Sequence, residues 1–131
     1  MDADLAAAVA LARQAVGAPD DLPARAARVR RLDRDATYVL VDLGAPGSPG
    51  WVAAVDPVHH DVMGWAVNAT GESTVPVVPE PPDGAGPDLV WWPGGPSRSP
   101  LYPLVRLTTA EGERFVDVTG RRHPPGPPTR G

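Results

Sequence analysis

Two stretches with the same layout decide the fold: TYVLVDLGAPGSPGWVAAVD at residues 37–56 and YPLVRLTTAEGERFVD at residues 102–117. Each holds an apolar run led by Tyr, a turn that contains Gly, a second apolar run and a final Val-Asp pair. β-Branched and aromatic residues in runs separated by such turns predict β-hairpins. The strongest predicted strand, residues 37–43, places Tyr38, Leu40 and Asp42 on one face and Val39, Val41 and Leu43 on the other.

The segment before the first hairpin predicts an amphipathic helix over residues 3–16. Its apolar residues recur at helical spacing, as Leu5, Val9, Ala12 and Val16. Gly17 is suited to the end of the helix, and Pro19 prevents its continuation.

Weaker strand patterns lie elsewhere in the chain. In residues 27–32, Val29 and Leu32 are separated by two Arg residues, so the alternation is broken unless a bulge lies there. Residues 62–68 predict a short strand or the end of the first hairpin. The run Leu-Val-Trp-Trp at 89–92 is apolar, and we expect it to dock on the core.

Residues 71–100 contain eight of the 18 prolines. Proline removes a backbone donor and fixes φ, so this segment predicts a linker or an extended wrap. We expect an α+β fold in which the N-terminal helix packs on an antiparallel sheet built from both hairpins. The expected organisation is one domain over residues 1–121, with 71–100 docked on it and 122–131 as a disordered tail.

The hairpin residues carry a resemblance. In the first copy these are Tyr38, Val39, Val41, Val55, Asp56 and the segment 61–65, and in the second Tyr102, Val105, Phe115, Val116, Asp117 and Gly120. With the preceding helix they resemble the PepSY-like, cystatin-like class of small domains over residues 3–66, and in part over 101–121. The turn that this class writes as Asp-x-x-Thr-Gly-Glu is here DPVHHD, residues 56–61. The resemblance implies a non-catalytic binding, inhibitory or regulatory module.

Composition narrows the classes of function. The net charge is −4, all 12 basic residues are Arg, and Cys is absent. The chain therefore lacks the basic footprint of a nucleic-acid binder and cannot form disulfides or thiolate metal sites. No apolar run approaches the roughly 18 residues of a membrane span. Asp2 and Asp4 stand where a secretory signal carries positive charge, so we expect a cytoplasmic protein without membrane partners.

The candidates for chemistry are better explained as turns and loops. His59 and His60, flanked by Asp56 and Asp61, predict a polar turn, because neighbouring strand residues face opposite ways and both His rarely reach one ion. Ser97 and Ser99 lack the context of a nucleophile. Asp42 with Asp56, or Asp56 with Asp117, could form a carboxylate pair for acid–base chemistry. We expect instead that Asp56 and Asp117 accept hydrogen bonds from backbone N–H groups in turns at strand ends. We therefore expect no catalytic, metal-binding or cofactor-binding residues, and not an enzyme.

A basic run comprises Arg25, Arg28, Arg30, Arg31 and Arg34. One interpretation is a patch for an acidic partner. The other, which we favour, is a solvated strand neutralised by the acidic residues on either side of it, Asp20, Asp21, Asp33 and Asp35.

Four Trp residues supply most of the aromatic bulk: Trp51, Trp65, Trp91 and Trp92. We expect at least two in the core. Adjacent Trp91 and Trp92 face opposite ways in an extended chain, so one is expected to be buried and the other exposed or covered by a partner. The segment 91–103 is the predicted contact surface, with Trp91, Trp92, Arg98 and Tyr102 as partner-binding residues.

The function we predict is a small interaction or regulatory module whose partner is another protein. Two alternatives stay open. One is a ligand-binding protein or small enzyme with a Trp-lined pocket between helix and sheet. The other is a structural subunit that self-associates through an uncovered sheet edge. The oligomeric state is not predicted.

Overall fold

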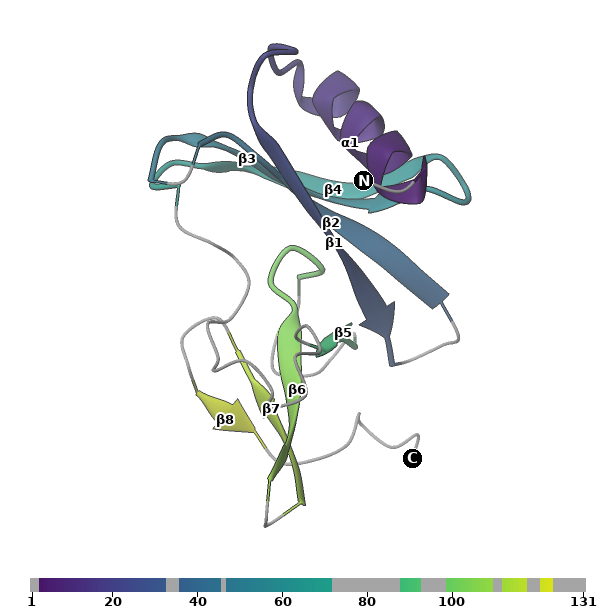
Figure 1. Cartoon of the computed structure of the whole chain (residues 1–131), viewed down its shortest axis with the longest axis vertical. Coiled ribbons are helices and arrows are strands. Elements are labelled where there is room, and N and C mark those ends of the chain that lie inside the picture. Colours follow the sequence, from purple (N-terminus) through teal and green to yellow (C-terminus); the bar gives the residue numbers. More distant parts are fainter. Residues whose placement is uncertain are drawn as a thin grey trace. The chain divides into compact units, whose positions relative to one another are not determined.

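The chain is α+β: the computed structural model has one N-terminal helix and a mixed sheet (Figure 1). It describes residues 3–32, 36–45, 47–71, 88–92, 99–109, 112–117 and 121–123. The elements are α1 (Ala3–Val16), β1 (Ala24–Arg31), β2 (Ala36–Leu43), β3 (Gly50–Asp56), β4 (Asp61–Asn68), β5 (Asp88–Trp91), β6 (Leu104–Thr109), β7 (Gly112–Val116) and β8 (Arg122–His123). The predicted Pro-rich connection lies largely outside the described residues.

The chain divides into two compact units, and strand β1 contributes to both. The first unit comprises residues 1–28 and 37–73, and the second comprises 29–36 and 74–131. In the first unit the strand order is β4-β3-β2-β1. β2 and β3 pair antiparallel, with Leu43 opposite Trp51, and β3 pairs antiparallel with β4.

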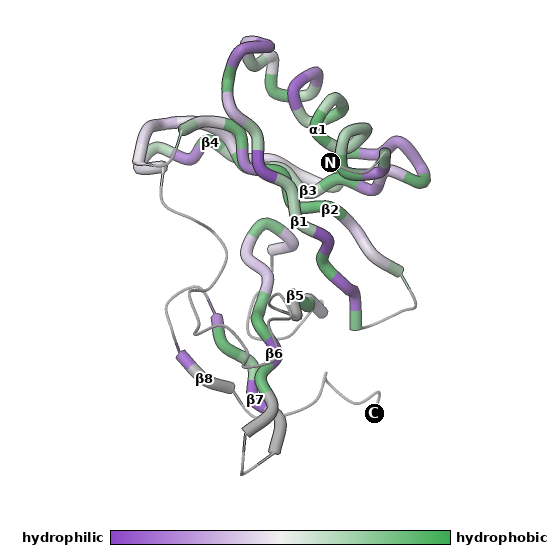
Figure 2. Tube along the Cα trace, in the orientation of Figure 1, coloured by the Kyte–Doolittle hydropathy of each residue, from purple (hydrophilic) through white to green (hydrophobic). Residues whose placement is uncertain are grey.

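The core of the first unit lies between α1 and one face of its sheet. Ala8 and Ala12 are fully buried, and the small side chains let the helix approach β3 and β4 closely (Figure 1). The face of β2 that holds Val39, Val41 and Leu43 packs against these two alanines, together with residues of β3. The buried cluster comprises Ala8, Ala12, Val39, Val41, Leu43, Ala53 and Val55. Most of α1 is coloured as hydrophobic in Figure 2, and its hydrophilic residues, Asp4, Arg13 and Gln14, lie near its two ends.

The opposite face of this sheet is also buried. Tyr38, Leu40, Val52 and Ala54 are each at most 4% exposed. Because both faces of β2 and β3 are apolar, the two strands read as almost continuous hydrophobic runs rather than alternating ones. Burial on both faces distinguishes these central strands from β4, where several side chains are exposed.

Two glycines fix the loop that joins β2 to β3. A Cβ on Gly50 would overlap the carbonyl oxygen of Leu43. Gly71 has a φ of +73°, and a Cβ there would overlap the backbone nitrogen and oxygen of Ser48. Gly47 N donates a hydrogen bond to Gly71 O at 3.3 Å, so the chain that leaves β4 lies directly against this loop.

In the second unit the strand order is β1-β5-β6-β7-β8, with residues 29–31 as its part of β1. β5 pairs parallel with β1, where Arg30 lies beside Val90 and Arg31 beside Trp91. The predicted all-antiparallel sheet is therefore wrong. A parallel pair needs a long crossover connection, and no local pattern indicates which distant strand will supply the partner.

Both faces of the second unit's sheet are apolar as well. One cluster holds Val90, Trp92, Leu104 and Phe115, with Leu32 packed against it. Val29 is fully buried, and alternation along β1 places it on the other face. The irregular Val29–Leu32 pattern thus needs no bulge, because each of the two apolar residues has a buried face to occupy. Arg122 and His123, predicted to begin the tail, pair with Val116 and Phe115 instead.

Candidate interaction surfaces

The structure buries both tryptophans of the predicted contact segment. Trp91 is 6% exposed and Trp92 3%. Trp92 packs in a cluster with Val90, Leu104 and Phe115, and β5, which ends at Trp91, lies between β1 and β6. The prediction that one of the two is exposed or left for a partner is therefore wrong for the isolated chain. The prediction that at least two tryptophans belong to the core is confirmed.

Aromatic contacts hold these two side chains in place. The guanidinium carbon of Arg31 lies 5.1 Å from the ring centroid of Trp91, within range of a cation–π interaction. Trp92 meets Phe115 edge to face, with ring centroids 4.8 Å apart. The Nε1 atom of Trp92 is buried and has no hydrogen-bond partner among the described residues. The two rings therefore act as core residues, one of them with an unsatisfied donor.

Tyr102 is the exposed part of the segment. Tyr102 N donates to Ser99 O at 3.1 Å and Leu101 N donates to Ser99 Oγ at 3.2 Å, forming a turn before β6. Leu101 and Pro103 are buried, so the turn is anchored on both sides of Tyr102, which is 41% exposed. Ser99 is thus a turn residue. Arg98 and Ser97 lie outside the described residues.

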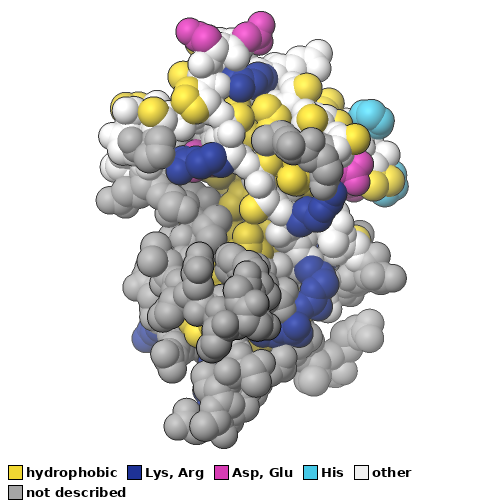
Figure 3. All heavy atoms as spheres, viewed as in Figure 1, with side chains coloured by type: hydrophobic (Ala, Val, Ile, Leu, Met, Phe, Trp, Pro, Cys, Tyr) yellow, Lys and Arg dark blue, Asp and Glu magenta, His cyan; other side chains and the backbone are white. Residues whose placement is uncertain are grey.

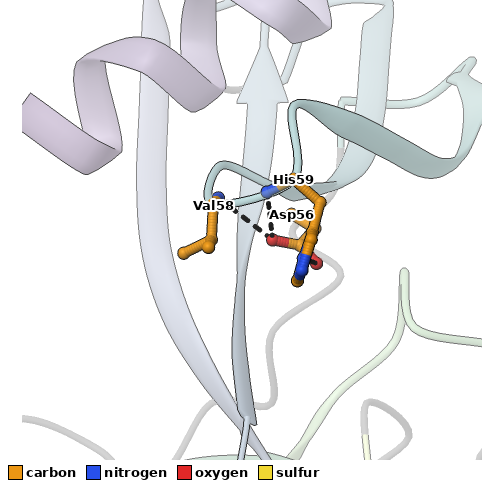
Figure 4. Close-up of polar contacts among 3 residues, drawn as sticks. All are labelled: Asp56, Val58 and His59. Carbon is orange, nitrogen blue, oxygen red and sulfur yellow. Dashed lines mark hydrogen bonds and ion pairs between the residues drawn. The ribbon is translucent and has the colours of Figure 1, made fainter.

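The Asp56–Asp61 turn is organised by Asp56 (Figure 4). Its Oδ1 accepts hydrogen bonds from Val58 N at 3.0 Å and from His59 N at 3.2 Å, and its Oδ2 lies 2.7 Å from His59 Nδ1. Burial raises the pKa of Asp56. The contacts with the side chain and backbone of His59 and with the Val58 N–H lower it by more, so the pKa of Asp56 lies below its usual value. His60 has a φ of 53°, a backbone conformation found in tight turns.

The predicted role of this turn is confirmed by these contacts, since Asp56 accepts backbone N–H groups. Asp117 does the same for Arg121 N at 3.1 Å. In the described part of the chain, no three His, Asp or Glu residues are grouped so that they could hold a metal ion. Nor does any described helix have the length and apolar character needed to cross a membrane.

Two residues of the basic run on β1 form ion pairs, as the salt-bridged interpretation predicts, but with other carboxylates than the flanking ones that it named. Arg25 Nη2 lies 2.5 Å from Asp42 Oδ2, and Arg28 Nη2 lies 3.8 Å from Asp4 Oδ2. The acidic partners in these two pairs come from β2 and α1. In the first unit, Arg side chains (dark blue) form separate spots on the face shown in Figure 3 rather than a continuous basic field. Arg34, Asp33 and Asp35 lie outside the described residues.

Strand β4 carries an exposed apolar pair that lies outside the predicted contact segment 91–103. Trp65 is 47% exposed and Val67 66%. They lie opposite Ala53 and Trp51 of β3, on the face that bears α1. Among the described strands, β4 has a neighbour on one side alone, so its other edge is open. The alternation Trp65-Ala66-Val67 was the available signal, but it does not reveal an edge position.

The helix–sheet interface holds few tryptophans. Ala8 and Ala12 occupy its centre, and Trp51 packs partly buried against the cluster. Trp91 and Trp92 belong to the second unit. The tryptophans predicted to line a pocket between helix and sheet therefore belong to two separate units.

Comparison with protein-family models, with curated proteins and with solved structures finds no match to this chain. The functional conclusion therefore rests on the geometry of the molecule itself.

Proposed function

We propose that this chain is a small, non-catalytic protein-interaction module. The carrying observation is the exposed pair Trp65 and Val67 on the regular backbone of β4. Large aromatic side chains are normally withdrawn from solvent, and Trp is favoured as an anchor of protein interfaces. In contrast to Trp91 and Trp92, Trp65 is available for contact without any change in the fold.

The position of the pair supports the same conclusion. Trp65 and Val67 lie two residues apart on the same face of β4, so their side chains are neighbours and form one continuous apolar area. Two polar side chains flank β4 and take part in turns: Asp56 holds the turn before it, and Asn68 Oδ1 accepts a hydrogen bond from Gly71 N at 3.1 Å after it. The surface is thus apolar in its middle and polar at its two ends, which is the usual layout of an interface.

The predicted segment 91–103 remains part of the proposal in a reduced form. Within it, Tyr102 offers an exposed aromatic side chain on an anchored turn. Trp91 and Trp92 are buried core residues and would not touch a partner directly. The PepSY-like resemblance also remains a proposal; a single helix packed on a sheet of β-strands is compatible with it, and the binding or regulatory role it implies agrees with the surface on β4.

The experiment compares three forms of the full chain as bait in the cell that produces it: wild type, Trp65→Ser and Tyr102→Ala. Circular dichroism and urea unfolding first establish that each variant is folded. We expect the Trp65→Ser bait to recover at least tenfold less of a specific partner than the wild type does. The decrease with Tyr102→Ala should be smaller. Unchanged recovery with both folded variants would overturn the proposal. Recovery lost with Tyr102→Ala alone would move the contact surface to residues 99–103.

A further inference from the structure

The turn between β3 and β4 holds two neighbouring histidines in different surroundings. His59 and His60 are both exposed, and both belong to the turn of residues 57–60. Asp56 Oδ2 lies 2.7 Å from His59 Nδ1 (Figure 4). Within the described ranges, no hydrogen bond or ion pair of this kind orients His60. The two imidazoles therefore differ in one contact and can be compared directly.

The carboxylate of Asp56 is itself fixed before it meets the imidazole. Its Oδ1 atom accepts hydrogen bonds from Val58 N and His59 N. The Asp56 side chain is 28% exposed, whereas the His59 side chain is 76% exposed. Ordinary surface ion pairs join two mobile side chains and lose conformational entropy when they form. Here one partner is already held by the backbone, so the ring of His59 has one preferred orientation.

The same contact determines which ring nitrogen of His59 carries the proton. An ionised carboxylate only accepts hydrogen bonds, so the neutral imidazole must hold its proton on Nδ1. The lone pair of the ring then lies on Nε2, the nitrogen remote from Asp56. A neutral imidazole attacks electrophiles through its unprotonated nitrogen. Asp56 thus directs the nucleophilic nitrogen of His59 away from the carboxylate.

We propose that His59 is a site of covalent modification, at which Nε2 accepts an acyl group from an uncharged activated donor such as a thioester. Nε2 attacks the carbonyl carbon, the N–C bond forms, and the C–S bond breaks with its electron pair on sulfur. The ring then releases its Nδ1 proton through Asp56 Oδ2, and the departing thiolate takes up one proton. The products are an N-acylimidazole and a free thiol. Asp56 is a positioning residue in this step.

The charges of the turn favour an acyl group over the other groups that imidazole accepts. Asp56 and Asp61 flank the two histidines, and their carboxylates would repel an anionic phosphoryl donor. A metal ion needs several ligands, and the described part of the chain offers no group of three. An acyl group brings no charge to the turn. The inference uses contacts within the turn alone and does not rest on the proposed function.

Acetylation of the full chain by p-nitrophenyl acetate, followed by peptide mass mapping, tests the proposal. The chain contains no Lys, so no side-chain amine competes for the reagent. His59 should be acetylated at least about fivefold faster than His60, because only His59 has its tautomer fixed. Hydroxylamine should remove the label, as expected for an acylimidazole. Equal rates at the two histidines would overturn the proposal.

The role of Asp56 is tested by two matched variants. Asp56→Asn allows both tautomers, since an amide can donate or accept, and should bring the rate at His59 down towards that at His60. Asp61→Asn removes the same charge from the same turn and should leave the rate unchanged. Circular dichroism first establishes that both variants are folded. Equal losses in the two variants would show a general effect of charge and would contradict the positioning by Asp56.

The tautomer has its own measurement. The ¹⁵N chemical shifts of the imidazole nitrogens distinguish the protonated from the unprotonated nitrogen at about pH 8.5, where an ordinary histidine is neutral. In the wild type, His59 should carry its proton on Nδ1, and a proton on Nε2 would overturn the inference. Trp65→Ser should change neither this signature nor the acetylation rate. Loss of a protein partner in that variant therefore reports on the proposed function alone.

Discussion

Arg31 lies over the indole ring of Trp91, its guanidinium carbon 5.1 Å from the ring centroid, where β1 and β5 run parallel side by side. The two residues are direct neighbours across the strands, so the pairing register itself brings the cation over the ring. The contact joins a strand from the first part of the chain to one from its last third. It therefore reports whether the parallel pair has formed.

Replacing Arg31 with Met should lower the free energy of unfolding by about 1 kcal/mol, the usual size of a cation–π contact at a partly exposed site. Met keeps an unbranched apolar side chain over the ring and removes the charge. Arg31→Lys is the control, because it keeps the positive charge and should recover part of the loss. Urea unfolding followed by Trp fluorescence measures both, and a Met variant as stable as the wild type would contradict the prediction.

Trp92 should tolerate replacement by Phe much better than replacement by Ala. Phe keeps most of the ring that meets Phe115 and removes the Nε1 donor, which is buried without a partner among the described residues. Removing an unsatisfied donor offsets part of the lost packing. Trp92→Ala empties the site and should cost about 3–5 kcal/mol. Thermal and urea unfolding compare the variants; similar losses for Phe and Ala would show that the indole nitrogen is satisfied.

Gly71→Ala should destabilise the first unit by about 1–3 kcal/mol, because the residue has a positive φ and the new Cβ would overlap Ser48. Gly64→Ala is the matched control: the added Cβ there meets no atom within 4 Å, and φ is not in the left-handed region. We expect its effect to stay within about 0.5 kcal/mol. Urea unfolding at low protein concentration measures both, and equal losses would refute the role assigned to Gly71.

The pH dependence of stability should reflect Asp56. Its pKa is lowered in the folded state, below the usual 3.8. A lowered carboxylate pKa means that this contribution is present above about pH 3.8 and is lost as pH falls through the folded-state pKa. Asp56→Asn should remove that component, so its free energy of unfolding should change less than that of the wild type between pH 5 and pH 2.

Asp42 should act in the opposite direction in the same experiment. Burial raises its pKa, and the nearby Arg25 offsets this in part. The folded state then binds the proton more tightly than the unfolded state, so Asp42 favours folding below about pH 3.8 and loses that contribution as pH rises through its folded-state pKa. Asp42→Asn should therefore steepen the loss of stability on acidification, whereas a shallower loss than in the wild type would contradict the assignment.

The elements that follow from local pattern could be predicted from the sequence. The helix over residues 3–16 is α1, and the runs at 37–43 and 51–56 coincide with β2 and β3. Helical spacing, β-branched residues and Gly-containing turns encode these elements within a few residues of chain. The Asp residues that end β3 and β7 were also predictable as turn acceptors, because the preference is local.

The exposure of the tryptophans could not be predicted in the same way. Trp65 and Trp91 are the same residue type in similar apolar surroundings of sequence. Their different exposure follows from strand order, since β4 is an outer strand and β5 an inner one. Strand order depends on pairing between distant segments, and the parallel pairing of β5 with β1 carries no local signal. The candidate surface on β4 is therefore identified by the strand order of the sheet and not by the local sequence.

Strand β1 also determines how the molecule can be taken apart. Ala24–Arg28 belong to the first unit and Val29–Arg31 to the second, and the chain passes from one unit to the other three times. Neither unit corresponds to a single continuous fragment. A protein shortened after residue 73 would keep every strand of the first unit but leave Val29, fully buried in the whole chain, without the second unit's strands. A single cut after residue 73 should consequently leave residues 29–36, which belong to the second unit, on the fragment that holds the first.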